Sequence, residues 1–181
     1  MTNVGKWDGW YEDLVEPAPY DDTAMYALGA EWLADCESVE DWGTGRGWFK
    51  TLRPDAIGID GSQTPFADVI ADLDTYRSTT PGLWMRGVIE HNWSWERILT
   101  NAVVSFTERM ALCLFTPDGP QVEQLAFVDP PGVPDLCIPT AFVDDILASF
   151  GCDWTCTEYA TATTYGVERL WLISKGTPCA Q

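Results

Sequence analysis

Three glycines spaced by two, with an acid two positions ahead of the first, are the residues in this sequence best suited to bind a ligand. The run reads Asp41-x-Gly43-x-Gly45-x-Gly47. Glycine has no Cβ and tolerates positive φ, so such a turn lets the backbone approach a ligand closely. An apolar segment follows at 56–59 and ends in Asp60. An acid at the end of a strand is placed to accept hydrogen bonds from two vicinal ribose hydroxyls, so the sequence predicts a nucleoside-binding site.

The spacing of the glycines indicates which nucleoside is bound. Dinucleotide-binding turns follow the pattern Gly-x-Gly-x-x-Gly, in which the third glycine lets the helix pack closely on the strand. Here the third glycine comes one residue early, and Trp48 stands where Gly or Ala is expected. Asp41 is also poorly suited to a site for two phosphates, whereas it suits a ligand that carries an ammonium group. The pattern therefore favours a nucleoside with a cationic substituent.

On these residues the chain resembles the class I S-adenosylmethionine-dependent methyltransferases, whose first motif is an acid-x-Gly-x-Gly-x-Gly run. The likeness covers roughly residues 20–175. Asp60, in Gly58-Ile59-Asp60-Gly61-Ser62, matches the family's ribose-binding acid, and Asp72, at the end of a strand within 67–73, matches the acid near the adenine. Residues 83–92 match the fourth strand and its exit. So few residues separate Asp60 from the third strand that the crossover helix between them must be shortened or missing.

The resemblance implies S-adenosylmethionine as cofactor and methyl transfer to an acceptor by in-line displacement. Asp41 would lie near the methionine ammonium, the turn would offer backbone contacts, and Arg86 would reach the cofactor carboxylate or another acid. The predicted cofactor-binding residues are Asp41, Gly43, Thr44, Gly45, Gly47, Asp60, Gly61, Asp72, Leu73 and Arg86.

Two residues at the exit of the fourth strand are candidates for catalysis. His91 is the single histidine of the chain, and its ordinary pKa lies near neutrality, so it could act as a base or orient the acceptor. It could equally cap the following turn or pack on Trp93. Glu90 could bind an amine acceptor, or it could be solvated or paired with Arg86.

The elements that must position these residues alternate along the chain. Apolar spacing predicts helices over 25–32, 94–106 and 142–150, and a buried strand over 109–115. Two β-rich segments at 154–164 and 167–174, separated by Tyr165-Gly166, predict an antiparallel hairpin. The expected fold is α/β: a doubly wound, mostly parallel sheet with helices on both faces and a C-terminal antiparallel hairpin, in a Rossmann-like three-layer sandwich.

The chain is expected to form one domain over residues 1–181. Residues 37–181 would be the cofactor-binding core, and residues 1–36 an N-terminal lid and helix segment. Its aromatic side chains could cover the cofactor or simply pack on the sheet edge; they are Trp10, Tyr11, Tyr20 and Tyr26. Because the chain has little room for a separate substrate domain, we expect the Pro-rich stretch 116–139 to carry acceptor specificity. Within it, Asp129-Pro130-Pro131-Gly132 is expected to form a proline-rich loop.

Composition limits the partners. The net charge is −18 with 10 Lys and Arg, so an extended nucleic-acid footprint is not expected, and a small-molecule or protein acceptor fits better. The six cysteines are scattered beside one histidine, so we expect reduced thiols and no metal site. No apolar run is long enough to span a membrane, and the N-terminus lacks a signal peptide pattern. These features predict a cytoplasmic protein of unspecified oligomeric state.

Other functions remain open at the level of sequence. The same pocket could serve a lyase, an aminopropyl-type transferase or a nucleotide-dependent oxidoreductase, although Trp48 and the terminal hairpin argue against the last. The protein could also be a non-catalytic module that binds the cofactor or keeps only the fold. No residue set specifies O, N, S or C methylation.

Overall fold

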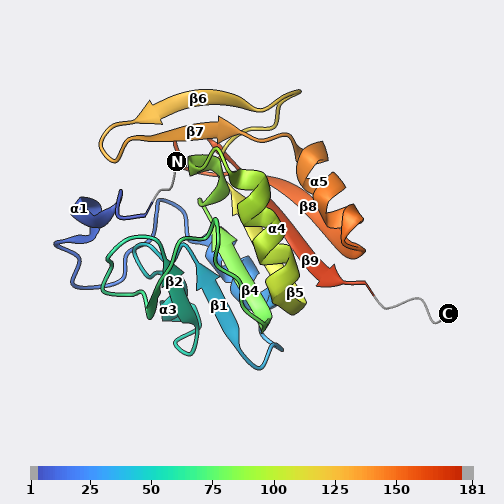
Figure 1. Cartoon of the computed structure of the whole chain (residues 1–181), viewed down its shortest axis with the longest axis horizontal. Coiled ribbons are helices and arrows are strands. Elements are labelled where there is room, and N and C mark those ends of the chain that lie inside the picture. The colour runs from blue at the N-terminus through green and yellow to red at the C-terminus, as the bar shows by residue number, and fades with distance from the viewer. Residues whose placement is uncertain (1–3, 177–181) are drawn as a thin grey trace.

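A seven-stranded sheet forms the centre of the protein in the computed structural model, which describes residues 4–176 (Figure 1). The strand order is β3-β2-β1-β4-β5-β9-β8. The strands span Val39–Trp42 (β1), Ile57–Asp60 (β2), Val69–Ile70 (β3), Thr80–Arg86 (β4), Phe106–Leu114 (β5), Cys152–Ala160 (β8) and Val167–Lys175 (β9).

Strands β1 to β5 are all parallel, and β9 is the strand that reverses the direction. β1 pairs in parallel with both β2 and β4, and β4 with β5. β9 lies antiparallel between β5 and β8. The predicted fold class is therefore confirmed, including the C-terminal hairpin. The carboxyl ends of β1, β2 and β4 meet at one edge of the sheet, which is where ligands bind in open α/β sheets.

Helices cover both faces of the sheet (Figure 1). The helices α2 (Ala24–Trp32) and α3 (Phe49–Leu52) contact each other, and α2 packs on β5 and β9. On the other face lie α4 (Trp95–Ser105) and α5 (Thr140–Ser149), together with the short 3-10 helix η1 (Ile89–His91). A further short helix, α1 (Asp8–Tyr11), lies beside the sheet in the N-terminal segment.

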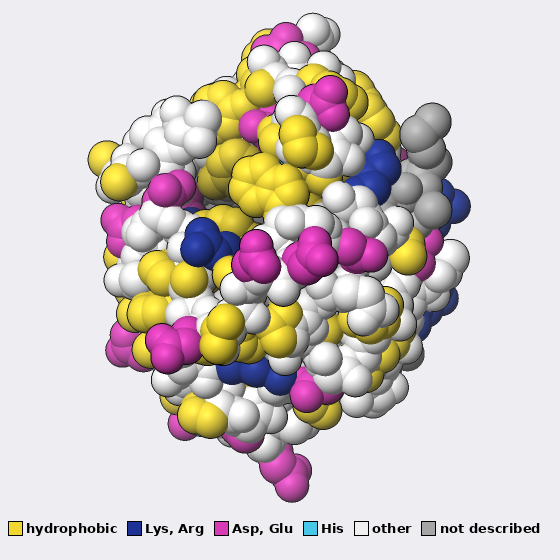
Figure 2. Space-filling model, turned by 90° about the vertical axis from the view of Figure 1, so that its left-hand side faces the viewer, with side chains coloured by type: hydrophobic (Ala, Val, Ile, Leu, Met, Phe, Trp, Pro, Cys, Tyr) yellow, Lys and Arg dark blue, Asp and Glu magenta, His cyan; other side chains and the backbone are white. Residues whose placement is uncertain are grey.

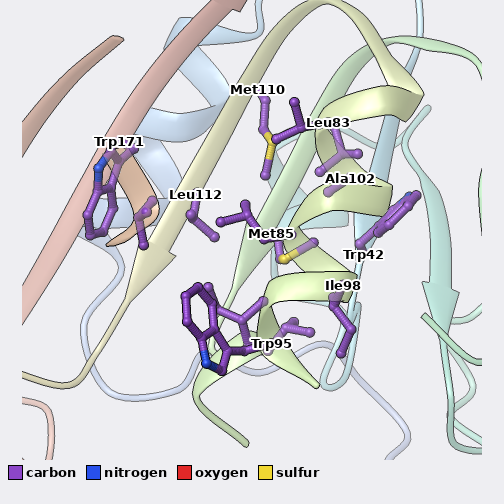
Figure 3. Packing of buried hydrophobic residues seen from close by; sticks show 14 of the residues in the cluster. Trp42, Leu83, Met85, Trp95, Ile98, Ala102, Met110, Leu112 and Trp171 are labelled. Carbon is purple, nitrogen blue, oxygen red and sulfur yellow. The ribbon is translucent and has the colours of Figure 1, made fainter. Parts of the chain in front are cut away.

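Side chains that alternate between the two faces of the central strands form a separate hydrophobic core on each face. Side chains of successive strand residues point to opposite faces. In β4, Leu83 and Met85 are buried under α4, while Trp84 between them joins the core under α2. Figure 3 shows the first core, in which Met110 and Leu112 of β5 continue the layer toward Trp171 of β9. This pattern of two buried faces accounts for the nearly continuous apolar run predicted as a buried strand.

The connections after β2 and β5 bear on three expectations from the sequence. Within residues 4–176 no helix lies between β2 and β3, so the predicted loss of that crossover helix is confirmed. The expected third strand over 67–73 is reduced to Val69–Ile70. The expected loop at Asp129-Pro130-Pro131-Gly132 is confirmed, but it is the turn of an antiparallel hairpin that was not predicted, formed by β6 (Glu123–Val128) and β7 (Val133–Cys137).

Within residues 4–176, none of the helices has the length and hydropathy needed to cross a membrane. Five of the predicted thiols are free cysteines: Cys36, Cys113, Cys137 and Cys152 are buried, and Cys156 is partly buried. Cys179 lies outside the described residues.

Replacing Gly47 with alanine is expected to lower the free energy of unfolding by about 2–3 kcal/mol. Gly47 has φ +71°, and a Cβ there would lie 2.3 Å from Cγ of Phe66. Gly166 has the same φ, +71°, but a Cβ there meets nothing within 4 Å. The Gly166→Ala variant therefore measures backbone strain alone and should cost about 1 kcal/mol. Denaturant unfolding of both variants tests this difference, and equal losses would show that the Phe66 contact is unimportant.

Candidate active site

A pocket of about 270 Å³ opens at the carboxyl ends of the parallel strands. It is bounded by the glycine turn after β1, the loops after β2, β3 and β4, the N-terminal segment, and the β6–β7 hairpin. Figure 2 views the side of the molecule that carries α1, where hydrophobic side chains gather around a hollow in the upper part of the face. The residues that line it include Val4, Trp7, Trp10, Tyr11, Tyr20, Asp21, Gly43, Asp60, Gly61, Ser62, Asp72, Leu73, Arg86, Val88, His91, Phe115, Val128, Asp135, Thr163 and Thr164.

The glycine turn has the left-handed geometry that its sequence predicts. Gly43, Gly45 and Gly47 have φ of +78°, +47° and +71°. The N–H groups of Gly43 and Thr44 donate to the carbonyl of Ile59 at 2.7 and 3.2 Å, which ties the turn to β2. Of the predicted turn contacts, only Gly43 lines the pocket, while Thr44, Gly45 and Gly47 support the turn from behind.

Asp41 is buried below this turn. Its carboxylate accepts a hydrogen bond of 2.9 Å from the hydroxyl of Thr44. Asp41 is 3% exposed, and burial raises its pKa to about 7, against the smaller lowering effect of Thr44. It does not itself line the pocket. The turn therefore holds an acid whose charge is costly in the absence of a cation.

Asp60 lies at the tip of β2 and lines the pocket. Its two carboxylate oxygens accept hydrogen bonds of 2.8 Å each from the N–H groups of Gly45 and Ser62. Burial raises its pKa, and these backbone donors act in the opposite direction. A carboxylate has about four acceptor positions, so these bonds leave acceptor capacity for a ligand. The predicted residues Gly61, Asp72 and Leu73 also line the pocket.

Arg86 lines the pocket but is held by protein groups. Its Nε donates to Glu168 at 2.7 Å, and Nη1 and Nη2 donate to the hydroxyl of Tyr26 and the carbonyl of Tyr20 at 3.0 and 3.1 Å. The acid that Arg86 reaches is therefore Glu168 on β9, which is fully buried. The alternative pairing of Arg86 with Glu90 was wrong.

The N-terminal segment lies over the glycine turn. The backbone of Ala18 pairs with that of Gly47, and the N–H of Gly5 donates to the carbonyl of Gly61 at 2.8 Å. The hydroxyls of Tyr11 and Tyr20 are 3.1 Å apart, and a Cβ on Gly45 would lie 3.1 Å from each. Together with Trp7 and Trp10 these tyrosines line the pocket, whereas Tyr26 is buried beneath it.

His91 faces the pocket from η1 and is oriented by β7. Its Nδ1 lies 3.1 Å from the carbonyl oxygen of Pro134 and 3.1 Å from Oδ1 of Asp135. Both neighbours are acceptors, so neutral His91 carries its proton on Nδ1, and Nε2 is the nitrogen that can take up a proton. The hydroxyl of Tyr165 donates to Oδ2 of Asp135 at 2.9 Å. Burial lowers the pKa of His91, but Asp135, Glu90 and Pro134 together raise it above its ordinary value.

Glu90 points away from the pocket. It is fully buried and does not line the pocket, and its Oε1 accepts a hydrogen bond of 2.8 Å from the N–H of Phe115. Burial raises its pKa. The structure thus brings His91 to the pocket and leaves Glu90 outside it. Glu90 is buried and not solvated. His91 packs on the rings of Trp7 and Phe115 and not on Trp93.

No protein-family model matches this chain, and no curated protein matches it in sequence. Among solved structures, it is similar to 1,6-didemethyltoxoflavin-N1-methyltransferase from Burkholderia thailandensis with S-adenosylhomocysteine bound (TM-score 0.66, 14% identity, 86% of this chain and 80% of that chain). It is also similar to an N-methyltransferase from Bradyrhizobium japonicum in complex with S-adenosylhomocysteine (TM-score 0.64, 11% identity, 96% and 100%). A third is magnesium protoporphyrin IX methyltransferase from Synechocystis with S-adenosylhomocysteine bound (TM-score 0.63, 16% identity, 85% and 82%).

The chain has the class I methyltransferase fold. At these identities the likeness establishes the fold alone.

On this class I methyltransferase fold, the side of the pocket around His91 is built from residues that the sequence did not single out. Phe115, Val128, Asp135 and Thr163 line it, and they come from the residue after β5, the β6–β7 hairpin and the loop before β9. Asp135 alone had a sequence signal: it is an acid inside the apolar run Val133-Pro-Asp-Leu-Cys137, and it is 5% exposed. A buried acid in such a run requires a partner, which here is His91.

The single histidine makes its environment directly measurable. NMR titration of the His91 ring is expected to give a pKa above 6.5, and Asp135→Asn should lower that value by about 1 or more. Because the folded pKa is raised, the stability from this pair is fully present below pH 6.5 and is lost as pH rises through the folded value. The control Asp55→Asn removes an acid that pairs with Arg53 instead. Equal shifts in both variants would show that Asp135 has no special effect on His91.

Proposed function

We propose that this protein transfers a methyl group from S-adenosylmethionine to an acceptor. The proposal rests on one observation: a single pocket is lined both by residues that fit a nucleoside and by a histidine paired with an acid. Gly43, Asp60 and Asp72 are the residues that fit a nucleoside, and the histidine and its acid are His91 and Asp135. The structural neighbours with S-adenosylhomocysteine bound support this assignment.

The residues present fit the proposed cofactor. Asp60 retains acceptor positions for the ribose hydroxyls, and Asp72 and Leu73 offer a polar and an apolar contact for the adenine. Asp41 would lie near the methionine ammonium, directly or through water, and a cation there would offset the cost of its buried charge. Gly43 lines the pocket, and only glycine fits there, since its φ is +78° and a Cβ would lie 2.2 Å from Cγ2 of Val88.

When bound, S-adenosylmethionine supplies a methyl group already activated by its sulfonium. The protein's tasks are then to orient the two reactants, exclude water and manage one proton. We propose His91 as the base: Nε2 takes the proton that the acceptor's nucleophile loses, while Asp135 and Pro134 hold Nδ1 and stabilise the charged ring. Trp7, Tyr11 and Tyr20 of the N-terminal segment would exclude water as a lid. Glu90 has a structural role in this proposal: it accepts the hydrogen bond from the N–H of Phe115 and holds the end of β5.

The experiment that tests the proposal is a product analysis. Purified protein is incubated with S-adenosylmethionine and a panel of phenols, amines and thiols, and products are identified by mass spectrometry. Formation of S-adenosylhomocysteine together with a methylated acceptor supports methyl transfer. Formation of methylthioadenosine instead would favour a lyase or an aminopropyl-type transferase. In the first case, His91→Gln should reduce turnover about 10²–10⁴-fold for an acceptor that must lose a proton.

We also propose that residues 1–36 form the lid and helix segment of a single domain whose core is 37–181, and that the acceptor is a small molecule rather than a nucleic acid. The side chain of His91 is 15% exposed and contacts Trp7 of the N-terminal segment, and this limited access supports a small acceptor. A cytoplasmic location fits the five free thiols among the described residues.

A further inference from the structure

We propose that the acceptor is a planar aromatic molecule, neutral or cationic, that binds against an aromatic wall formed by Trp10, Trp7, His91 and Phe115. This inference rests on the proposed function, because it names the substrate class of the same pocket. It concerns binding, so it can be tested separately from methyl transfer.

The four rings of the aromatic wall form a continuous series. The ring centroids of Trp10 and Trp7 are 5.6 Å apart, those of Trp7 and His91 5.2 Å, and those of His91 and Phe115 5.4 Å. All four residues line the pocket. Tyr165 stacks on Phe115, with ring centroids 5.8 Å apart, and helps to hold that end of the series. An aromatic ligand could make offset or edge-to-face contacts with these rings, which a saturated ring of the same size could not.

The wall is assembled from distant parts of the chain. Trp7 and Trp10 belong to the N-terminal segment, His91 follows β4, and Phe115 follows β5. Trp10 remains 51% exposed although it lines the pocket, and Val4, which also lines it, is 46% exposed. Large apolar side chains exposed at the rim of a pocket mark a surface that a ligand covers. Figure 2 shows hydrophobic side chains gathered around the hollow on this face.

Charge excludes an anionic acceptor. Asp21, Asp60, Asp72 and Asp135 line the pocket, and Arg86 is the one Lys or Arg among its described lining residues. The charge of Arg86 is matched by the fully buried Glu168 at 2.7 Å, so it does not attract a second anion strongly. A carboxylate or phosphate on the acceptor would therefore be repelled, whereas a phenol, a ring N–H or an amine would be accepted.

The wall also places the reactive atom. His91 sits in the middle of the series, with Nδ1 turned toward Pro134 and Asp135. An aromatic acceptor lying along the wall would present an edge substituent near the imidazole. A hydroxyl or N–H on that edge would be the group that loses its proton to His91.

The test uses three probes of similar size: 2-naphthol, its saturated analogue decahydro-2-naphthol, and 2-naphthoate. Binding is measured by calorimetry at pH 7, with and without saturating S-adenosylhomocysteine, and the NMR signal of the His91 ring reports where each probe binds. We expect 2-naphthol to bind and to shift the His91 signal, with the other two probes at least about tenfold weaker. Equal binding of decahydro-2-naphthol, tighter binding of 2-naphthoate, or no His91 shift with 2-naphthol would overturn the proposal.

Variants separate the wall from general surface effects. Trp7→Leu should weaken 2-naphthol binding about tenfold, while Trp93→Leu, which changes an exposed tryptophan outside the pocket, should leave it unchanged within about twofold. Unchanged binding by Trp7→Leu would contradict the assignment. Binding of 2-naphthol by a protein that does not bind S-adenosylhomocysteine would keep the aromatic site and reject the proposed function. The reverse result would reject the aromatic site alone.

Discussion

Replacing Asp60 with alanine is expected to weaken the binding of S-adenosylmethionine by more than about 100-fold. In the proposed complex, this carboxylate accepts hydrogen bonds from two ribose hydroxyls, and hydrogen bonds to a charged group are among the strongest in proteins. Asp60 also accepts from the N–H groups of Gly45 and Ser62, so it holds the glycine turn in place while it binds the ligand. Calorimetric titration of the variant with S-adenosylmethionine measures the loss.

The control for this variant is Thr64→Val. The hydroxyl of Thr64 donates to the carbonyl of Gly45 at 2.6 Å, and Thr64 is buried but does not line the pocket. The substitution therefore disturbs the same turn without removing a ligand contact, and we expect it to weaken binding by no more than about tenfold, the effect of one neutral hydrogen bond. Denaturant unfolding confirms that both variants fold. Equal weakening in the two variants would show that Asp60 acts only through the turn.

Replacing Arg86 with methionine is expected to lower the free energy of unfolding by about 3–5 kcal/mol. The side chain of Arg86 is 6% exposed, and that of its partner Glu168 is 0% exposed. Removing the guanidinium leaves a carboxylate buried without its cation, and it also removes the donors to Tyr20 and Tyr26 that fasten the N-terminal segment. Denaturant unfolding at neutral pH measures the loss.

The double variant Arg86→Met with Glu168→Met isolates the cause of this loss. If the uncompensated charge dominates, removing both partners should cost clearly less than removing Arg86 alone, since paired apolar replacements are often close to neutral. A double variant as unstable as the single one would show that the hydrogen bonds to the N-terminal segment matter more than the charge of Glu168. A loss below about 1 kcal/mol in the single variant would contradict the structural role of Arg86.

The glycine turn and the strand after it could be predicted from sequence because local rules fix them. Positive φ requires glycine, and an acid after an apolar strand marks the ligand-binding edge of a parallel sheet. The spacing did not reveal that Gly45 and Thr44 serve Asp60 and Asp41 rather than face the pocket. That assignment depends on how the turn is tied to Ile59 across the strand pair, which is a tertiary contact.

The β6–β7 hairpin could not be predicted because its sequence lacks the usual strand pattern. Pro134 within β7 has no N–H to donate, and prolines are confined to the edges of sheets. β6 is largely exposed, so burial imposes little apolar alternation on it. Because the hairpin was not predicted, the contact of His91 with Asp135 of β7, which orients the imidazole ring, was not predicted either.

The role of the N-terminal segment also depended on long-range contacts. Its aromatic residues could be read either as a cover for the cofactor or as packing on the sheet edge. The structure places Tyr11 and Tyr20 over Gly45, and pairs the backbone of Ala18 with Gly47. Contacts between residues so far apart in sequence leave no local signal. The aromatic residues indicated only that the segment could cover an apolar surface or a ligand.

The central claim is that this pocket binds S-adenosylmethionine, and calorimetric titration of the unmodified protein tests it most directly. S-adenosylmethionine, S-adenosylhomocysteine and NAD are titrated separately into protein shown to be folded. Binding of both adenosyl ligands with micromolar dissociation constants, and no binding of NAD, is the predicted result. Absence of binding by either adenosyl ligand, or tighter binding of NAD, would contradict the account and leave only the fold.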